Sequence, residues 1–343
     1  MTETALNFTT SKAPDSPLQD NTTSDIWVDD LERLAKDYLL DCDYRMQSPR
    51  TIETRRFFIQ NLLWFLRNRG FTTCGTIELR QFFAYLQHGH NEPGGRWGKA
   101  NYTRPVRPIT IKDYYVNLRC LFNWLVADGV LQTSPLDKIP KPKVRVEQVQ
   151  PFTQEQIEAL RKAARSSANA KRDEAIILFL YDTGVRASEL CGLKLQDLDL
   201  SSRHASVLGK GNKRRLVYFS RETGKALSTY LRNQKREPHD PVFASVSGTR
   251  TGQALTRSGL LQLIERLGKA AGIKAMKVSP HVFRHSAAIQ LLRNGCDVYS
   301  LMSLMGHTSL TVCQNYLKLS KLDLENQYRR CSPVDSLARR RAD

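Results

Sequence analysis

The sequence lacks the cysteine patterns that mark disulfide-stapled domains and zinc sites. Its seven cysteines are odd in number and scattered along the chain, and no two of them form a CxxC pair. Disulfide frameworks use an even, closely spaced set of cysteines, and structural zinc sites use short paired spacings. We therefore expect reduced thiols and no metal site built from cysteine.

Long hydrophobic runs are missing as well. The longest, such as Ala175–Tyr181, are far shorter than the roughly 20 apolar residues that span a bilayer. The beginning of the sequence also has no basic segment followed by an apolar one, which is the pattern of a secretory signal. We therefore expect an intracellular, cytoplasmic protein without a membrane partner.

Acidic residues are scarce relative to basic ones. Lys and Arg together number 52 and Asp and Glu 34, which gives a formal net charge of +18. The first 25 residues oppose this trend, since they hold four acidic residues against Lys12 alone. A basic surface of this size favours a polyanionic partner, with nucleic acid ahead of an anionic membrane. A merely soluble basic protein is the plain alternative.

The length of 343 residues predicts two domains, of which the first is expected to be all-α. Residues 1–24 are polar and rich in Thr, Ser and Asp, so we expect a disordered tail. Residues 25–132 form the helical domain, in which a long loop from His88 to Pro108 either contacts DNA through its basic residues or is disordered. Hydrophobic periodicity predicts four helices in this domain: Ile26–Asp41, Ser48–Asn68, Ile77–Gln87 and Thr110–Asp128.

Residues 133–151 have the composition of an interdomain linker. Pro135, Pro140, Pro142 and Pro151 forbid a helix and favour an extended chain. Basic side chains accompany the prolines, so the segment is suited to follow a DNA backbone, although an inert spacer fits the composition equally well. The candidate DNA-contacting residues in this segment are Lys141, Lys143 and Arg145.

Residues 152–332 are expected to form a second, mostly helical domain with a small β-hairpin, followed by a basic tail at 333–343. A TxxQ capping-box pattern at Thr153 opens its first helix, and the apolar segment Asp173–Asp182 predicts a buried central helix that ends near Gly184. Two strands flanking GKGNKR predict the hairpin, His204–Leu208 and Arg215–Phe219. The basic tip of the hairpin supplies two more candidate DNA contacts, Lys213 and Arg214.

A dense set of groups suited to phosphate chemistry begins at a predicted helix start near residue 280. Ser279 is a suitable N-cap and the proline after it suits the first helical position, so His281 and Arg284 lie in about the first turn. Free N–H groups and the positive end of the helix dipole favour an anion there. His281 and His285 have the spacing of a zinc helix, but Val282 stands where a zinc protease needs Glu, so zinc is not expected.

Two further basic groups lie far upstream. Arg186 follows the predicted helix stop at Gly184, where a phosphate clamp would be held firmly. A surface ion pair with Glu189 is the plain alternative, and it is favoured for Arg186 taken alone. Lys210 lies at the hairpin tip, from which a mobile lysine can donate a proton to a leaving oxygen. Basic hairpin tips often only contact solvent, so Lys210 alone is a weak signal.

His307 and Tyr316 complete the candidate set. His307 directly follows Gly306, which closes a short predicted helix, and Tyr316 lies in the helix after it. Tyr316 is three residues from Cys313 on the apolar face, so a core aromatic is the favoured interpretation of this residue alone.

Together, these groups resemble the active site of the tyrosine recombinases, the family that includes phage integrases, Xer resolvases and Cre. The resemblance spans about Trp27 to Tyr328, and the segments TGVRASEL, GKGNKRR, SPHVFRHSAA and MGHTSL are Xer-like. It implies an all-α core-binding, SAM-like domain at residues 25–132 and a mainly α catalytic domain at 152–332, which close on duplex DNA as a clamp.

The resemblance also implies a role for each matched residue. Tyr316 would be the nucleophile that forms a 3′-phosphotyrosyl bond and frees a 5′-hydroxyl. Arg186 and Arg284 would grip the non-bridging phosphate oxygens. Lys210 would protonate the departing 5′-oxygen, and His281 would assist proton movement at the tyrosine.

The remaining implied roles are supporting ones. His307 would hydrogen-bond the phosphate, while Glu189 and His285 would support the arginines and the helix. Neither metal nor ATP would be needed, because the arginines supply positive charge and the phosphotyrosine conserves the energy of the broken bond.

The implied partners are double-stranded DNA with a specific recombination site and further copies of the chain. Exchanging two duplexes requires four strand cleavages, which implies a homo-tetramer on two sites, with the C-terminal tail docking on a neighbour. The implied role is integration or excision of a mobile element, or dimer resolution, on DNA of the bacterial nucleoid. The rival hypotheses are a topoisomerase-like nicking and resealing enzyme and a non-catalytic accessory DNA-binding protein on the same fold.

The excess of basic residues predicts a steep dependence of DNA affinity on salt. Neutralised phosphates release condensed counterions, so affinity should fall about 10³-fold or more between about 50 and 200 mM salt. Fluorescence anisotropy with a labelled duplex measures this slope. A flat salt response would contradict a DNA-binding surface made of lysine and arginine.

Overall fold

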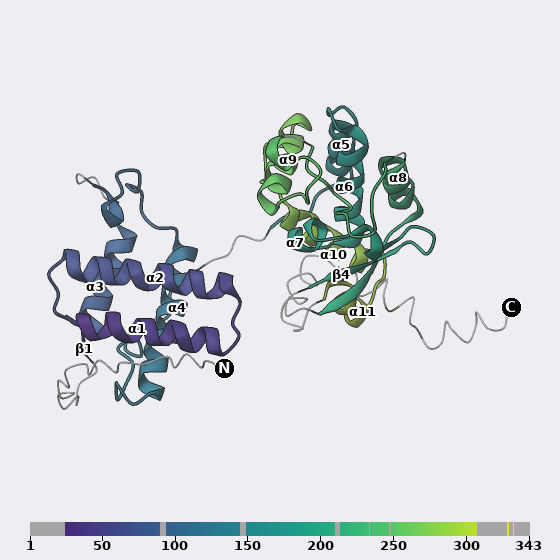
Figure 1. Ribbon diagram of the computed structural model, residues 1–343. Helices are drawn as coiled ribbons and strands as arrows, with labels where there is room; N and C mark the ends of the chain where they lie inside the picture. Colours follow the sequence, from purple (N-terminus) through teal and green to yellow (C-terminus); the bar gives the residue numbers. More distant parts are fainter. Residues whose placement is uncertain are drawn as a thin grey trace, which may run out of the picture. The chain divides into compact units, whose positions relative to one another are not determined.

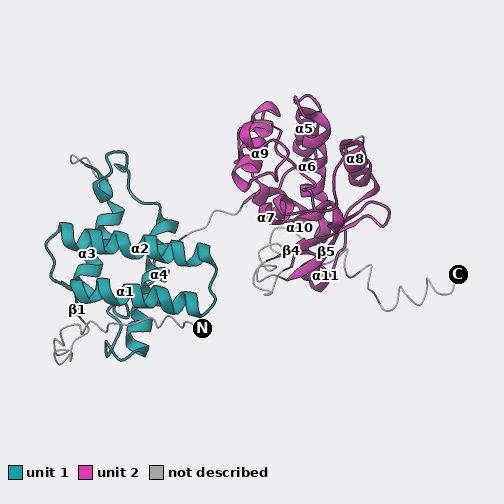
Figure 2. Cartoon of the chain, viewed as in Figure 1, with its two compact units in different colours: residues 1–147 teal, residues 148–343 magenta. Residues whose placement is uncertain are grey.

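The computed structural model describes residues 25–89, 94–144, 149–209, 213–232, 234–246, 248–306, 328 and 332. The chain divides into two compact units, residues 1–147 and 148–343 (Figure 2). Among the described residues, no helix has the length and apolar character needed to cross a membrane.

Unit 1 is built from four helices and one short antiparallel strand pair (Figure 1). The four predicted helices are confirmed, and their ends lie within three residues of the predicted ones. The elements of this unit are β1 Ile26–Trp27, α1 Val28–Tyr44, α2 Pro49–Asn68, β2 Thr73–Cys74, α3 Thr76–Gln87, the 3₁₀ turn η1 Arg96–Gly98 and α4 Pro108–Ala127.

Local sequence explains where the helices of unit 1 begin and which faces they bury. Ser48 caps α2 by accepting a hydrogen bond from the N–H of Thr51, and Pro49 occupies its first turn. The buried positions of α1 recur at helical spacing, from Leu31 through Leu34 to Tyr38. They contribute to a single core shared by all four helices.

The long loop of unit 1 contributes to this core. Trp97 is buried and packs edge-to-face against Trp64, with ring centroids 5.6 Å apart. Arg96 is also buried and donates to the carbonyl of Arg104 at 2.7 Å. Arg96 therefore holds the loop closed, and its burial does not favour the DNA contact that was one of the two alternatives for this loop.

The predicted linker at 133–151 is only partly a linker. Leu136 and Ile139 belong to the core of unit 1, and the carbonyl of Ile139 accepts from the hydroxyl of Tyr115 at 2.9 Å. At its other end, Val149 packs against the core of unit 2. The proline content suggested an extended chain, but prolines also permit turns, and apolar side chains between them gain free energy by burial. Lys141 and Lys143 are exposed, and Arg145 lies outside the described residues.

Unit 2 combines seven described helices with a small antiparallel sheet (Figure 1). The predicted hairpin is confirmed as β4 and β5, and a short strand that we did not predict, β3, pairs with β4. The elements are α5 Gln154–Arg165, α6 Ala170–Thr183, α7 Ala187–Cys191, η2 Leu195–Asp197, β3 Leu198–Asp199, β4 His204–Leu208, β5 Arg214–Tyr218, α8 Arg221–Leu231, η4 Gly248–Arg250, α9 Arg257–Ala270, α10 Pro280–Arg293 and α11 Val298–Met305.

Helix α6 is the central element of unit 2, as its apolar sequence predicts. Ile176, Ile177 and Phe179 are fully buried, and α5, α8 and α10 all pack against α6. The predicted capping box at Thr153 opens α5. The predicted stop at Gly184 is confirmed too, since this residue ends α6 with a left-handed φ of 60°.

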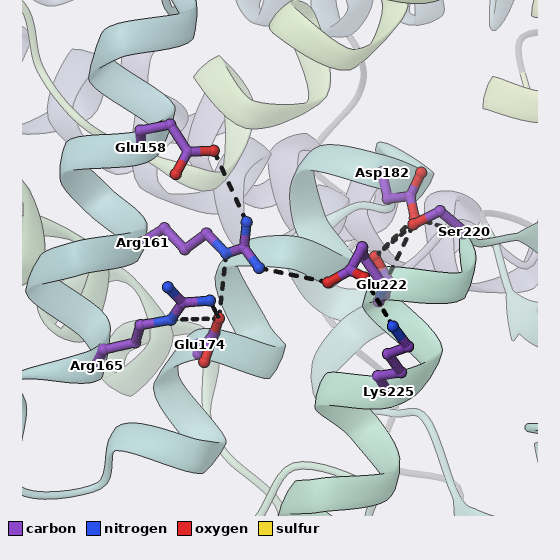
Figure 3. Close-up of polar contacts among 9 residues, drawn as sticks. Glu158, Arg161, Arg165, Glu174, Asp182, Ser220, Glu222 and Lys225 are labelled. Carbon is purple, nitrogen blue, oxygen red and sulfur yellow. Dashed lines mark hydrogen bonds and ion pairs between the residues drawn. The ribbon is translucent and has the colours of Figure 1, made fainter.

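An ion network ties α5, α6 and α8 together (Figure 3). The guanidinium of Arg161 lies 3.1 Å from Glu174 of α6 and 3.6 Å from Glu222 of α8. Asp182 accepts from the N–H of Ser220 at 2.6 Å, which fixes the start of α8. These contacts hold two flanking helices against α6.

Replacing Gly184 with Ala is expected to lower the free energy of unfolding of unit 2 by more than the cost of placing Ala at a positive φ. A Cβ there would lie 2.7 Å from Cε of the buried Met305 and 3.2 Å from Cβ of Ala287. Gly272→Ala is the matched control, because Gly272 has φ 72° and a Cβ there would meet no heavy atom within 4 Å. We expect a loss of about 1 kcal/mol for the control and about 2–4 kcal/mol for Gly184→Ala in urea unfolding followed by circular dichroism. Equal losses would mean that the contact with α11 is loose.

Candidate active site

Three arginines from separate elements converge on the C-terminal end of α11. The last carbonyls of a helix lack intrahelical partners and carry the negative end of the helix dipole, so cations are stabilised there. Each of the last three carbonyls accepts a guanidinium N–H: Leu304 from Arg215 at 3.1 Å, Met305 from Arg284 at 2.6 Å and Gly306 from Arg186 at 3.1 Å.

Arg284 is the buried member of this set. It lies in α10, and it also donates to the carbonyl of Gly184 at 2.8 Å. Arg284 therefore joins the end of α6 to the end of α11 and is fixed from two sides. A side chain held in this way is preorganised for binding a phosphate.

Arg186 is the most exposed member, with 34% of its side chain accessible. It occupies the N-cap position of α7, where its backbone N–H and its side chain each bond to Glu189 at 2.8 Å. The ion pair that we considered for Arg186 is present, but its guanidinium also contacts Gly306 and so belongs to the cluster. The structure brings together the predicted Arg186, Glu189 and Arg284.

Glu189 is the carboxylate around which two of the arginines are arranged. Its side chain is only 1% exposed, and Arg215 donates to both of its oxygens, at 2.6 and 2.8 Å. Burial alone would raise the pKa of this carboxyl, but hydrogen bonds from Arg215 and Arg186 more than offset it and hold the pKa below its ordinary value. Three guanidiniums and one carboxylate leave a net positive charge, which suits the site to an anion.

Arg215 is the member of the arginine cluster that the sequence did not lead us to expect. It lies in the basic run of the hairpin, from which we selected Lys210 as a candidate proton donor and Lys213 and Arg214 as candidate DNA contacts. The alternation of side chains along β5 could have identified Arg215, because this residue shares a face of the strand with the buried Val217. Arg214 lies on the opposite face, where it is exposed and pairs with Asp197 at 2.7 Å.

The two histidines of α10 have different environments. His281 is exposed in the first turn, whereas His285 is buried. Burial lowers the pKa of His285, a hydrogen bond with the backbone of Val149 opposes this, and the charge of His281 adds to the lowering. Ser279 occupies the N-cap position as expected, and its side chain makes no capping hydrogen bond.

Lys210, His307 and Tyr316 lie outside the described residues, but the segments that lead to them start at the arginine cluster. A Cβ on Gly209, the residue before Lys210, would lie 3.5 Å from Oε1 of Glu189 and 3.8 Å from Nη1 of Arg215. Gly306, the residue before His307, accepts the hydrogen bond from Arg186. No group of three or more His, Cys, Asp or Glu residues suited to a metal ion occurs in the described part of the chain.

Comparison with known proteins agrees with this geometry. Residues 150–322 match the phage integrase family. The chain is 31% identical over 269 residues to the tyrosine recombinase XerD of Listeria innocua, which covers 78% of this chain and 86% of the relative. It is 30% identical over 303 residues to the tyrosine recombinase XerC of Mycobacterium bovis, which covers 84% and 95%.

Two solved structures share the fold. The XerH site-specific recombinase bound to its difH substrate after cleavage matches with a TM-score of 0.63 and 21% identity, over 88% of this chain and 84% of that one. The Tn1549 transposon integrase in complex with circular intermediate DNA matches with a TM-score of 0.61 and 19% identity, over 82% and 94%. The predicted mainly α fold with a small sheet is confirmed.

The chain belongs to the phage integrase family, the tyrosine recombinases. Its predicted class of enzyme, a tyrosine-type site-specific recombinase, is thereby confirmed. The comparisons do not favour the topoisomerase-like enzyme or the accessory protein.

The buried His285 should make the free energy of unfolding of unit 2 depend on pH. Because its pKa is lowered in the folded chain, the unfolded chain takes up the proton first as pH falls below the ordinary value of 6.5. The free energy of unfolding of the native chain should therefore fall relative to that of His285→Gln as pH drops from about 8 to about 5. Urea unfolding across this range measures the difference, and a pH-independent difference would contradict a neutral, buried imidazole.

Proposed function

We propose that this protein cleaves and rejoins duplex DNA at a specific site, with Tyr316 as the nucleophile. The observation that carries the proposal is the cluster of Arg186, Arg215 and Arg284 at the end of α11. It places concentrated positive charge at the start of the segment that holds His307 and Tyr316. Strand cleavage by a phenol needs such charge, because negative charge builds on the phosphate oxygens in the transition state.

The reaction proceeds by exchange of one phosphodiester bond for another. The hydroxyl oxygen of Tyr316 attacks the phosphorus, a 3′-phosphotyrosyl bond forms, and the bond from phosphorus to the 5′-oxygen breaks. Lys210 gives its proton to that oxygen, and His281 assists removal of the phenol proton. Attack by a 5′-hydroxyl of a second strand reverses these steps and completes the exchange.

The arginines divide the work of binding the phosphate. Arg186 has a partly exposed guanidinium that can turn toward a non-bridging oxygen. Arg284 acts from a buried position, where its charge is screened less by water. His307 hydrogen-bonds the phosphate, while Glu189 and His285 hold the surrounding elements. Neither a metal ion nor ATP takes part, because guanidinium groups supply the charge.

The partners that we propose are double-stranded DNA and three further copies of the chain. The relatives of known structure include recombinases in complex with DNA, and the exposed Lys141, Lys143 and Lys213 are suited to phosphate contacts. Exchange between two duplexes needs four nucleophiles, which leads to a tetramer on paired sites, with the tail Lys321–Asp343 docking on a neighbour. We place this activity on bacterial nucleoid DNA in the cytoplasm, in mobile-element integration or excision or in dimer resolution.

The test is covalent trapping on DNA that the protein itself selects. Bound DNA is cross-linked, recovered and sequenced, and a nicked suicide duplex carrying that site is incubated with the protein in EDTA. We expect a covalent adduct for the native chain, and unchanged binding but no adduct for Tyr316→Phe. Removing the only nucleophile of a step abolishes that step.

Tyr299→Phe is the matched control for this experiment. Tyr299 lies in α11 and its side chain is 73% exposed, so loss of its hydroxyl should leave adduct formation intact. An adduct that persists in Tyr316→Phe would refute the assignment of the nucleophile. Relaxation of supercoiled DNA that lacks the selected site would instead favour a topoisomerase.

A further inference from the structure

We infer that Arg215 is a positioning residue for strand cleavage, which keeps Glu189 from neutralising Arg186 and ties the hairpin to the end of α11. This inference rests on the proposed function of the same site. Arg215 would act through its neighbours and not by touching the phosphate, since the carboxylate of Glu189 binds both of its Nη atoms and balances its charge.

The contacts of Arg215 use all three nitrogens of its guanidinium. Nη1 and Nη2 bind the two oxygens of Glu189 at 2.6 and 2.8 Å, which is the forked geometry that fixes both groups most firmly. Nε donates to the carbonyl of Leu304 at 3.1 Å. The guanidinium plane is thereby fixed in both position and orientation.

The first consequence is electrostatic. Glu189 is buried and shared between Arg215 and Arg186. Without Arg215, Arg186 would be the remaining guanidinium bonded to this carboxylate, and a buried charge that loses a partner strengthens its hold on the one that stays. Arg186 would then be held away from a phosphate and its charge would be cancelled. Arg215 therefore keeps the more exposed arginine available for substrate.

The second consequence is mechanical. Arg215 lies opposite Val207 in the hairpin, and the loop between Gly209 and Lys213 begins beside it. A Cβ on Gly306 would lie 3.0 Å from Cδ of Arg215, so the backbone at the end of α11 is packed directly on this side chain. Through Arg215, the end of β4 at Gly209, which precedes Lys210, and the end of α11 at Gly306, which precedes His307, are held against one rigid side chain.

The test compares five variants: Arg215→Met, Arg215→Lys, Glu189→Gln, the double variant Arg215→Met with Glu189→Gln, and Arg161→Met. Arg161 is the matched control because its guanidinium is also largely buried, 20% exposed, and also bridges carboxylates, but it does so in the network of α5, α6 and α8 (Figure 3). Thermal melting by circular dichroism verifies that each variant is folded.

Single-turnover cleavage of the suicide duplex and DNA affinity are then measured separately. We expect Arg215→Met to lower the cleavage rate about 100-fold with less than about a threefold change in Kd, and Arg161→Met to leave the rate unchanged. Arg215→Lys should recover part of the rate. The double variant should cleave about tenfold faster than Arg215→Met, because glutamine no longer competes for Arg186.

A second measurement does not depend on activity. Hydrogen exchange should become faster in Arg215→Met both in the peptide covering the end of α11 and in the peptide covering Gly209–Lys213, and in neither for Arg161→Met. Unchanged exchange, or a folded Arg215→Met that cleaves at the native rate, would overturn the inference. A double variant as slow as Arg215→Met would overturn its electrostatic part. If the native chain forms no adduct but exchange changes as expected, the proposed function fails and the coupling stands.

Discussion

The arginine cluster of unit 2 depends on the buried carboxylate of Glu189. Glu189 is withdrawn from water, and such a charge is tolerated only with well-placed partners. Its partners are the N-cap residue of α7 and a strand residue of the hairpin, so the charge requirement of one side chain fixes two elements. Both arginines then reach the same helix end. The arginines that compensate the negative charge of Glu189 are thereby gathered at one place, where they can also bind the negative charge of a phosphate.

Two glycines in the left-handed conformation give the arginines access to the helix ends. Gly184 and Gly306 end α6 and α11 with φ near 60°, and the chain turns sharply away at each of them. The carbonyls at these ends are left open to guanidinium groups, and Arg284 binds one at each end. The close packing around both glycines leaves little room for a side chain. Backbone geometry thus prepares the acceptors that the arginines need.

Hydrophobic periodicity and the residues that cap or end helices predicted most of the fold, because helical faces, N-caps and C-terminal glycines are set by nearby sequence. The prediction was wrong where burial overrode composition, as at Leu136 and Ile139 in the proline-rich segment. In the site, Arg186, Glu189 and Arg284 are brought together as the resemblance implied. Arg215 was missed because its neighbours are basic too. Only the alternation of side chains along the strand distinguishes an arginine that faces the protein interior from one that faces solvent. Pairings across distant segments have no local signature.

The packing of Trp64 on Trp97 belongs to a wider asymmetry between the two units. All four tryptophans of the chain, at positions 27, 64, 97 and 124, fall within unit 1, whereas the arginine cluster belongs to unit 2. Intrinsic tryptophan fluorescence is therefore a spectroscopic reporter confined to one unit. A change in tryptophan emission on adding DNA or a second copy of the chain would report events in unit 1. Unit 2 has no tryptophan and would not contribute to this emission.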